Sequence, residues 1–286
     1  MKENLMALKA EIGKIIATAL AEDIGPGDVT TTGALSGMET GYAKAVAKSD
    51  TVIAGLDVFR ETFLYMDKEI SFKAQVEDGQ SVAKGDIIAL LEGRLMSILM
   101  AERVALNLFQ RMCGIATQTR RLVEAVQGTP AKIIHTRKTA PGLRILDTYA
   151  VRAAGGYSHR FGLFDGALIK ENHIAAAGGI AAAVAGVRRR IPLTVKIEVE
   201  VERMDQVEEA IQAGADVIMF DNMSPEEMSR AVKIVAGRVP LEASGNVTLA
   251  NVKAVAATGV DYISSGALTH SVKAADISLR VEYRHE

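Results

Sequence analysis

Short apolar runs alternate with longer amphipathic segments from residue 132 to residue 264. The short runs are rich in Ile, Val and Ala, as buried parallel strands are, and the longer segments repeat apolar residues every three or four positions, as helices do. This alternation predicts parallel strands connected by crossover helices. The strand-like runs cover 132–136, 166–170, 193–201, 216–220, 241–243 and 262–264, and helical patterns cover 204–213, 225–236 and 249–257.

The number of these strand and helix units favours a closed arrangement over an open sheet. An open doubly wound sheet usually carries a glycine-rich dinucleotide loop between a strand and a helix. The nearest match, GPGDVT at residues 25–30, lacks the third glycine and follows a helical segment. We therefore expect an α/β barrel.

The chain has a different rhythm before about residue 110. The opening segment is an amphipathic helix that ends at Gly25, Pro26 and Gly27, which break helices. Strand-like patterns follow at 41–54 and 70–76, two further short strands lie within VEDGQSVAKGDIIALLEG, and a long helix is predicted over 95–113. The change of rhythm indicates that the chain is built in two parts.

Composition describes an ordinary globular protein, with 49% hydrophobic and 24% charged residues. The formal net charge of -2 argues against a nucleic-acid-binding surface, which is normally basic. The single cysteine, Cys113, has no partner for an internal disulfide, and we interpret it as a packing residue of a protein in a reducing compartment. No secretory signal or membrane-length apolar run is recognisable, so we expect a cytoplasmic protein without a membrane partner.

A basic segment stands out against this nearly neutral background. Between His135 and His173, arginines, lysines and glycines are interleaved. Cations gathered in a folded core require anions, because an unpaired buried charge is costly, and glycines let the backbone approach a ligand closely. The segment therefore predicts a small substrate with several negative charges. Its cations are Arg137, Lys138, Arg144, Arg152, Arg160 and Lys170.

Polar residues follow the carboxyl ends of the predicted strands, the edge at which α/β barrels place their active sites. Arg137-Lys138 and His159-Arg160 have the chemistry to hold a dicarboxylate, because arginine binds carboxylates through two hydrogen bonds. His159 is either a proton donor or a structural histidine. Lys170 is interpreted as a fixed charge rather than as a Schiff-base lysine, because arginines lie nearby.

Carboxylates and glycine turns complete the predicted rim. Glu198, Glu200 and Glu202 share one face of their strand. Glu200 and Asp221 together resemble a sparse magnesium site; the alternative is that one of them pairs with Lys170 or Lys196. Two turns offer backbone N–H groups and a hydroxyl before a helix, which is typical of phosphate binding but also of ordinary helix caps. They are Ser244-Gly245-Asn246 and Ser265-Gly266-Ala267.

Taken together, these motifs resemble the quinolinate phosphoribosyltransferases. The matching runs are EDIGPGDVTT, ERVALNLFQRMCGIAT, HTRKTAPGLRILDTYAV, GGYSHRFGLFDGALIKENHI, KIEVEVE, GADVIMFDNM, LEASGNVT and GVDYISSGALTHS, in this order along nearly the whole chain. The resemblance implies the type II phosphoribosyltransferase fold: an N-terminal α/β sandwich domain over residues 1–112, to which the tail 273–286 returns, and an incomplete α/β barrel over residues 113–272. It also implies a homodimer with shared active sites.

The resemblance also implies roles for individual residues. Arg103 would reach the neighbouring subunit's site and bind a substrate carboxylate. Glu200 and Asp221 would work with Mg²⁺, and with Lys138 and Lys170 they are the expected catalytic residues. The two glycine turns, Ser244-Gly245-Asn246 and Ser265-Gly266-Ala267, would hold the 5′-phosphate of phosphoribosyl pyrophosphate. The residues expected around quinolinate and part of phosphoribosyl pyrophosphate are Arg137, Lys138, His159, Arg160 and Lys170.

The implied reaction transfers a phosphoribosyl group to quinolinate with loss of carbon dioxide, giving nicotinate mononucleotide. The chain departs from the family's GGGxNHR pattern at Ala154 and Ser158, which leaves His159 and Arg160 in place. Two other functions compete with this one. A lipoyl or biotin carrier hairpin at Lys84 is disfavoured by the ordinary Lys-Gly-Asp bend, and a non-catalytic ligand sensor is disfavoured by the intact basic and acidic residues.

Overall fold

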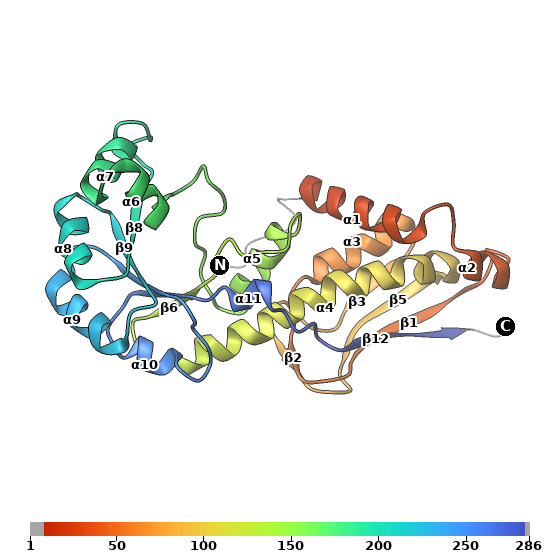
Figure 1. Ribbon diagram of the computed structural model, residues 1–286. Coiled ribbons are helices and arrows are strands. Elements are labelled where there is room, and N and C mark those ends of the chain that lie inside the picture. The colour runs from red at the N-terminus through yellow and green to blue at the C-terminus, as the bar shows by residue number, and fades with distance from the viewer. Residues whose placement is uncertain (1–8, 284–286) are drawn as a thin grey trace. The chain divides into compact units, whose positions relative to one another are not determined.

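The computed structural model describes residues 9–283, which divide into two compact units (Figure 1). Within the described residues, unit 1 contains 9–118, 140–155 and 272–283, and unit 2 contains 119–139 and 156–271. These units differ from the expected domains, 1–112 and 113–272, mainly in two segments: residues 113–118 and residues 140–155 group with unit 1. The beginning of the predicted first helix and the last three residues of the tail lie outside the described residues.

Unit 2 is built on a six-stranded sheet in the order β6-β11-β10-β9-β8-β7. Every neighbouring pair in it is parallel. Within the described residues, β6 and β7 remain the two edges, so the prediction of an incomplete α/β barrel is confirmed. The strands are β6 (Lys132–Ile134), β7 (Ala167–Ile169), β8 (Ile197–Val201), β9 (Val217–Asp221), β10 (Leu241–Ser244) and β11 (Tyr262–Ser264).

Helices connect these strands. Figure 1 shows α7, α8 and α9 as a row of neighbouring helices on one side of the sheet. The start of α9 follows from local chemistry, because Ser224 and Glu227 form a reciprocal cap there. Two helices between β7 and β8 escaped prediction because their alanine-rich sequence has little contrast between polar and apolar positions. The helices of this unit are α6 (Glu171–Ala177), α7 (Ile180–Arg188), α8 (Met204–Gln212), α9 (Pro225–Val235), α10 (Val252–Ala256) and α11 (Ala267–His270).

The strand predicted over 193–201 begins too early. The observed strand starts at Ile197, and Leu193 is 99% exposed. Pro192 has no N–H to contribute to a sheet, and Val195 donates its backbone N–H to the Pro192 carbonyl in a turn. Residues 193–196 therefore form a turn before the strand, although Leu193 and Val195 are apolar.

Unit 1 contains a four-stranded antiparallel sheet in the order β12-β1-β5-β3. The tail enters it as β12 (Ile277–Tyr283), which pairs with β1 (Thr40–Ala47) from Gly41 to Ala47. The remaining elements are β2 (Thr51–Val52), β3 (Ser71–Ala74), β4 (Ser81–Val82), β5 (Ile87–Arg94), α1 (Lys9–Ile24), α2 (Val29–Ala34), α3 (Leu56–Met66), α4 (Leu95–Ala125), which runs on past residue 118, and α5 (Arg144–Ala153).

Aromatic side chains form the centre of unit 1. Phe59 of α3 stacks on Phe109 of α4 with ring centroids 4.7 Å apart, and Phe63 packs edge-on against Phe59. Cys113 is buried in the same cluster, as predicted, and burial raises the pKa of its thiol. Across the described residues, no helix combines the length and the apolar character needed to cross a membrane.

Candidate active site

A pocket of about 690 Å³ lies at the carboxyl ends of the strands of unit 2. All the predicted site residues except Arg103 line it, although they come from the ends of six strands and from the loop between α5 and β7. Arg103 lies on α4 in unit 1, where it is exposed. The predicted residues that line the pocket are Arg137, Lys138, His159, Arg160, Lys170, Glu200, Asp221, Ser244, Gly245, Asn246, Ser265, Gly266 and Ala267.

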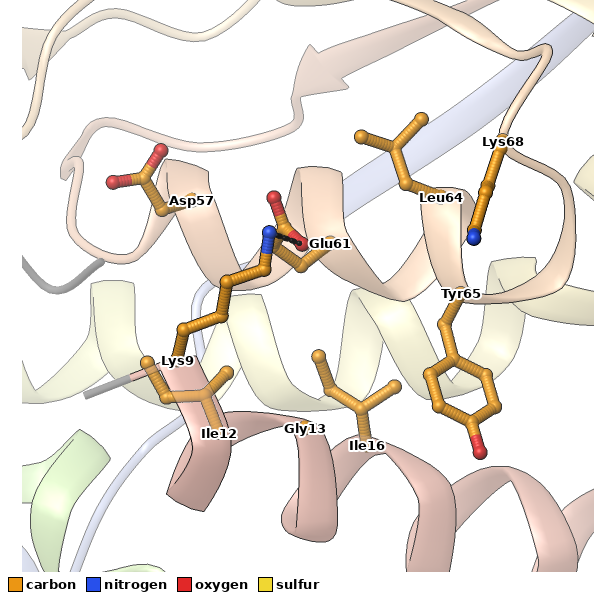
Figure 2. Close-up of a pocket in the computed structure, with 9 residues that line it drawn as sticks. All are labelled: Lys9, Ile12, Gly13, Ile16, Asp57, Glu61, Leu64, Tyr65 and Lys68. Atoms are coloured by element: carbon orange, nitrogen blue, oxygen red, sulfur yellow. Dashed lines mark ion pairs between the residues drawn. The ribbon is translucent and has the colours of Figure 1, made fainter. Parts of the chain in front are cut away.

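A second hollow of about 420 Å³ lies between α1 and α3 in unit 1 (Figure 2). Figure 2 shows Lys9 reaching from α1 towards Glu61 on α3, with which it forms an ion pair of 3.5 Å. The charges of this hollow are thus of both signs and partly paired. The pocket of unit 2, in contrast, gathers cations on one side, and we take it as the candidate active site.

The cationic side of the pocket contains buried donor atoms without partners. Within the described residues, the Nε atoms of Arg137 and Arg160 are buried and form no hydrogen bond. Burial lowers the pKa of Arg160, and the nearby positive charge of Arg137 lowers it further. Two partly desolvated guanidinium groups that repel each other are stabilised by an anion placed between them. This side of the pocket therefore has the chemistry of a carboxylate site.

Lys170 and Glu200 form an ion pair of 2.7 Å across the ends of β7 and β8. This is the alternative pairing that the sequence left open for one of the two carboxylates. The second carboxylate, Asp221 at the end of β9, accepts a hydrogen bond of 3.1 Å from the Asn222 amide. Both carboxylates line the same pocket.

Glu200 and Asp221 could hold a magnesium ion only in a site with few protein ligands. Within residues 9–283, the one cluster of three close His, Cys, Asp or Glu ligands does not include Glu200 or Asp221. Mg²⁺ commonly binds through one or two carboxylates and takes its other ligands from water and phosphate. Glu200 and Asp221 match that pattern and do not form a cage made by the protein alone.

The turn after β10 is held in shape by Asn222. Gly245 has a φ of 93°, and a Cβ at this position would lie 2.2 Å from the Asn222 Oδ1 atom. The side chain of Asn246 donates to the same oxygen at 3.0 Å, and the backbone N–H of Asn222 donates to the Ser244 carbonyl at 3.0 Å. Asn222 was not predicted as a site residue. It could have been predicted, because it directly follows Asp221 at the carboxyl end of β9.

The expectation that both glycine turns directly precede helices is only half right. α11 begins at Ala267, immediately after Gly266, whereas α10 begins at Val252, well beyond Asn246. The turn after β10 therefore offers its own N–H groups and no helix end. Gly266 allows close packing, because a Cβ there would lie 2.9 Å from the Cδ atom of Lys138.

Two residues that line the pocket, His159 and Glu242, form a cluster with the buried Glu198. The His159 Nε2 atom lies 3.1 Å from Glu198 Oε2 and 3.4 Å from Glu242 Oε2. Burial disfavours the charged imidazole, whereas the hydrogen bonds from Nε2 to the two glutamates favour it and raise the pKa of His159. The backbone N–H of Arg160, which donates to Nδ1 at 2.6 Å, opposes a second proton on the ring. Burial also raises the pKa of the Glu242 carboxyl, while its hydrogen bond with His159 acts in the opposite direction.

Glu242 was missed at the sequence level. It lies two residues before Ser244 on β10, and side chains two apart in a strand share a face. The reasoning that placed Glu198 and Glu200 together would have placed Glu242 beside Ser244. The predicted strand, 241–243, is short and apolar apart from Glu242, and for this reason Glu242 was not recognised as a site residue.

Comparisons with known proteins cover nearly the whole chain. A family model described as the quinolinate phosphoribosyl transferase N-terminal domain matches residues 28–113, and one described as the C-terminal domain matches residues 115–280. A probable nicotinate-nucleotide pyrophosphorylase (carboxylating) of Bacillus subtilis is 46% identical over 276 residues, which are 96% of this chain and 95% of that protein.

Solved structures show the same similarity. The structure of NadC from Streptococcus pyogenes superposes with a TM-score of 0.92 at 40% identity and covers 96% of this chain and 98% of its own. The nicotinate-nucleotide pyrophosphorylase of Francisella tularensis gives a TM-score of 0.90 at 40% identity, covering 96% of each chain. The N-terminal family model spans Lys84, so the carrier-hairpin alternative is wrong.

Proposed function

This chain belongs to the quinolinate phosphoribosyltransferase family, and we propose that the pocket of unit 2 catalyses that family's reaction. The reaction transfers the phosphoribosyl group of phosphoribosyl pyrophosphate to quinolinate, with decarboxylation, as a step of NAD biosynthesis. The observation that carries the proposal is the pair of guanidinium Nε atoms of Arg137 and Arg160, which are buried without hydrogen-bond partners in residues 9–283 and share one pocket with the two glycine turns. A dicarboxylate and a phosphate would occupy the two sides.

The cations bind and orient quinolinate in this proposal. Arg137 and Arg160 would take the carboxylates, because guanidinium groups match carboxylate geometry. Lys138 follows Arg137 at the same strand end, and its carbonyl is held by the Thr269 hydroxyl at 2.9 Å. Lys170 is already oriented by Glu200. These fixed charges would hold the pyridine nitrogen towards the ribose without a covalent enzyme intermediate.

The acidic side would hold the second substrate. Glu200 and Asp221 are the residues that would bind Mg²⁺, which when bound would neutralise the pyrophosphate leaving group. The turns at Ser244-Gly245-Asn246 and Ser265-Gly266-Ala267 would bind the 5′-phosphate through backbone N–H groups. Glu200 and Asp221 would also favour the positive charge that develops on the ribose ring.

The chemical step then follows from the bound geometry. The bond from the ribose anomeric carbon to the pyrophosphate oxygen breaks, and a bond from the quinolinate nitrogen to that carbon forms. The ring nitrogen becomes positively charged and attracts electrons. The neighbouring carboxylate can therefore leave as carbon dioxide, and its ring carbon keeps the bonding pair and takes a proton.

We also propose a cytoplasmic homodimer with shared sites. In this assembly Arg103 of the partner subunit would complete the quinolinate pocket. The loop that carries Arg160 is consistent with a dimer interface, because its Leu163 and Phe164 side chains are 75% and 78% exposed in the single chain. Neighbouring apolar side chains exposed to this degree are typical of a surface that another protein covers.

The first experiment tests the reaction itself. Purified protein is mixed with quinolinate, phosphoribosyl pyrophosphate and Mg²⁺, and nicotinate mononucleotide and carbon dioxide are followed. We expect product only when all three components are present. Turnover of nicotinate without any turnover of quinolinate would contradict the proposed substrate, and full activity after chelation would contradict the metal requirement.

Gly245→Ala tests the phosphate turn. The added Cβ would collide with Asn222 and displace the turn, so we expect the KM for phosphoribosyl pyrophosphate to rise on the order of tenfold or more. Gly214→Ala is the matched control, because Gly214 has a φ of 82° and no atom within 4 Å of its added Cβ. Equal KM values in the two variants would remove the turn from the phosphate site.

A further inference from the structure

Both ring nitrogens of His159 are occupied by the protein itself. The backbone N–H of Arg160 donates to His159 Nδ1 at 2.6 Å. On the other side of the ring, Nε2 lies within hydrogen-bond distance of Glu198 and Glu242. Neither nitrogen is left over for a substrate.

These contacts determine the tautomer of the ring. A backbone N–H can only donate, so Nδ1 must present its lone pair to Arg160. The proton of the neutral ring is then on Nε2, where two carboxylates accept it. The same three side chains have ligand atoms within 4.8 Å of one another, the spacing of a metal site. A protonated Nε2 has no lone pair for a metal, so the hydrogen bond to Arg160 argues against that alternative.

The hydrogen bond to Nδ1 fixes the start of the loop that presents Arg160. Asp165 accepts the backbone N–H groups of Phe161 and Gly162 at 2.7 and 2.8 Å, which closes the loop. The guanidinium Nη1 of Arg160 donates to the Gly166 carbonyl at 3.0 Å. Arg160 is therefore held at its backbone by His159 and at its head by Gly166, and its buried Nε remains for a ligand.

We propose that His159 and Glu242 are positioning residues: Glu242 and Glu198 fix the His159 ring, and the ring holds Arg160 in the orientation that binds a quinolinate carboxylate. This inference rests on the proposed function and refines it, because it removes His159 from the groups that touch substrate. Glu242 is the better residue to change, since Glu198 lies next to the strand position of Glu200. Glu242 reaches the ring from a different strand, β10.

Paired variants of Glu242 provide the test. In Glu242→Ala the ring loses an acceptor, and we expect the KM for quinolinate to rise on the order of tenfold while kcat and the KM for phosphoribosyl pyrophosphate change little. In Glu242→Gln the amide oxygen still accepts the Nε2 proton, so the KM for quinolinate should return close to the wild-type value. An unchanged KM in Glu242→Ala, or an equal loss in both variants, would overturn the proposal.

A second measurement does not depend on enzyme kinetics. Nitrogen NMR of histidine-labelled wild-type protein at neutral pH, assigned with His159→Asn, should show His159 protonated at Nε2 and not at Nδ1. A proton on Nδ1, or zinc bound stoichiometrically by wild type and lost in Glu242→Gln, would overturn the inference. Wild-type turnover separates the two claims: no product from wild type contradicts the proposed function, whereas normal wild type with a normal Glu242→Ala variant contradicts only the positioning role.

Discussion

Arg137→Ala should raise the KM for quinolinate on the order of a hundredfold, because it removes a charged donor from a partly desolvated site. In the described part of the chain, the Arg137 Nε atom is buried without a hydrogen bond, and the charge of Arg137 adds to burial in lowering the pKa of Arg160. The side chain thus costs stability in the free protein and is compensated only when an anion binds. The melting temperature of the variant should be unchanged or slightly higher.

Steady-state kinetics with each substrate varied in turn, together with a thermal melt, measure both effects. Arg137→Lys keeps the charge but loses the planar pair of donors, so it should lie between wild type and alanine. Arg203→Ala, which removes an arginine whose side chain is 62% exposed, is the control for charge alone. A normal KM for quinolinate in Arg137→Ala would mean that the pocket binds its substrate elsewhere.

Asp147→Ala should destabilise unit 1 by about 3–5 kcal/mol, the usual cost of removing one partner of a buried ion pair. Asp147 is fully buried on α5, and Arg111 of α4 donates to both of its oxygens at 2.8 Å. The backbone N–H of Ala140 donates to the same carboxylate at 3.1 Å. The substitution therefore removes the acceptor for three donors at once.

Chemical denaturation gives the free energy of unfolding, and the melting temperature should fall by roughly 10 °C for a chain of this size. Asp205→Ala is the matched control, because it breaks the exposed pair with Arg203, whose two side chains are 62% and 70% exposed, and should leave the melting temperature unchanged. If both variants melt at the same temperature, the buried pair does not stabilise unit 1 as argued.

Much of unit 2 was predictable because its strands and helices differ in period. Five of the six predicted strands overlap the observed ones to within two residues at either end, since buried parallel strands form short apolar runs between breakers. Alanine-rich α6 and α7 lack this contrast and were not predicted. The strand at β8 was predicted too long because the apolar Leu193 and Val195 look like strand residues, whereas Val195 donates its backbone N–H to Pro192 in a turn.

The site was predictable only where position along a strand implies position in space. Parallel strands bring their carboxyl ends to one edge, so Arg137, Lys170 and Asp221 were expected together and do line one pocket. Glu242 was missed because it is the only polar residue of the predicted strand 241–243, and its place on the face of Ser244 was not considered. The pairing of Lys170 with Glu200 was left open for the same reason.

The amino-acid sequence by itself determined the alternation of strands and helices, the identity of the groups at each strand end and the family of the chain, because these depend on local periodicity and residue type. Tertiary structure alone decided which charges are paired. Lys170 is neutralised by Glu200, Arg137 has no ion pair within the described residues, and His159 has both nitrogens occupied. Such pairings depend on side chains from strands far apart in the sequence, where a shift of an ångström decides whether a hydrogen bond forms.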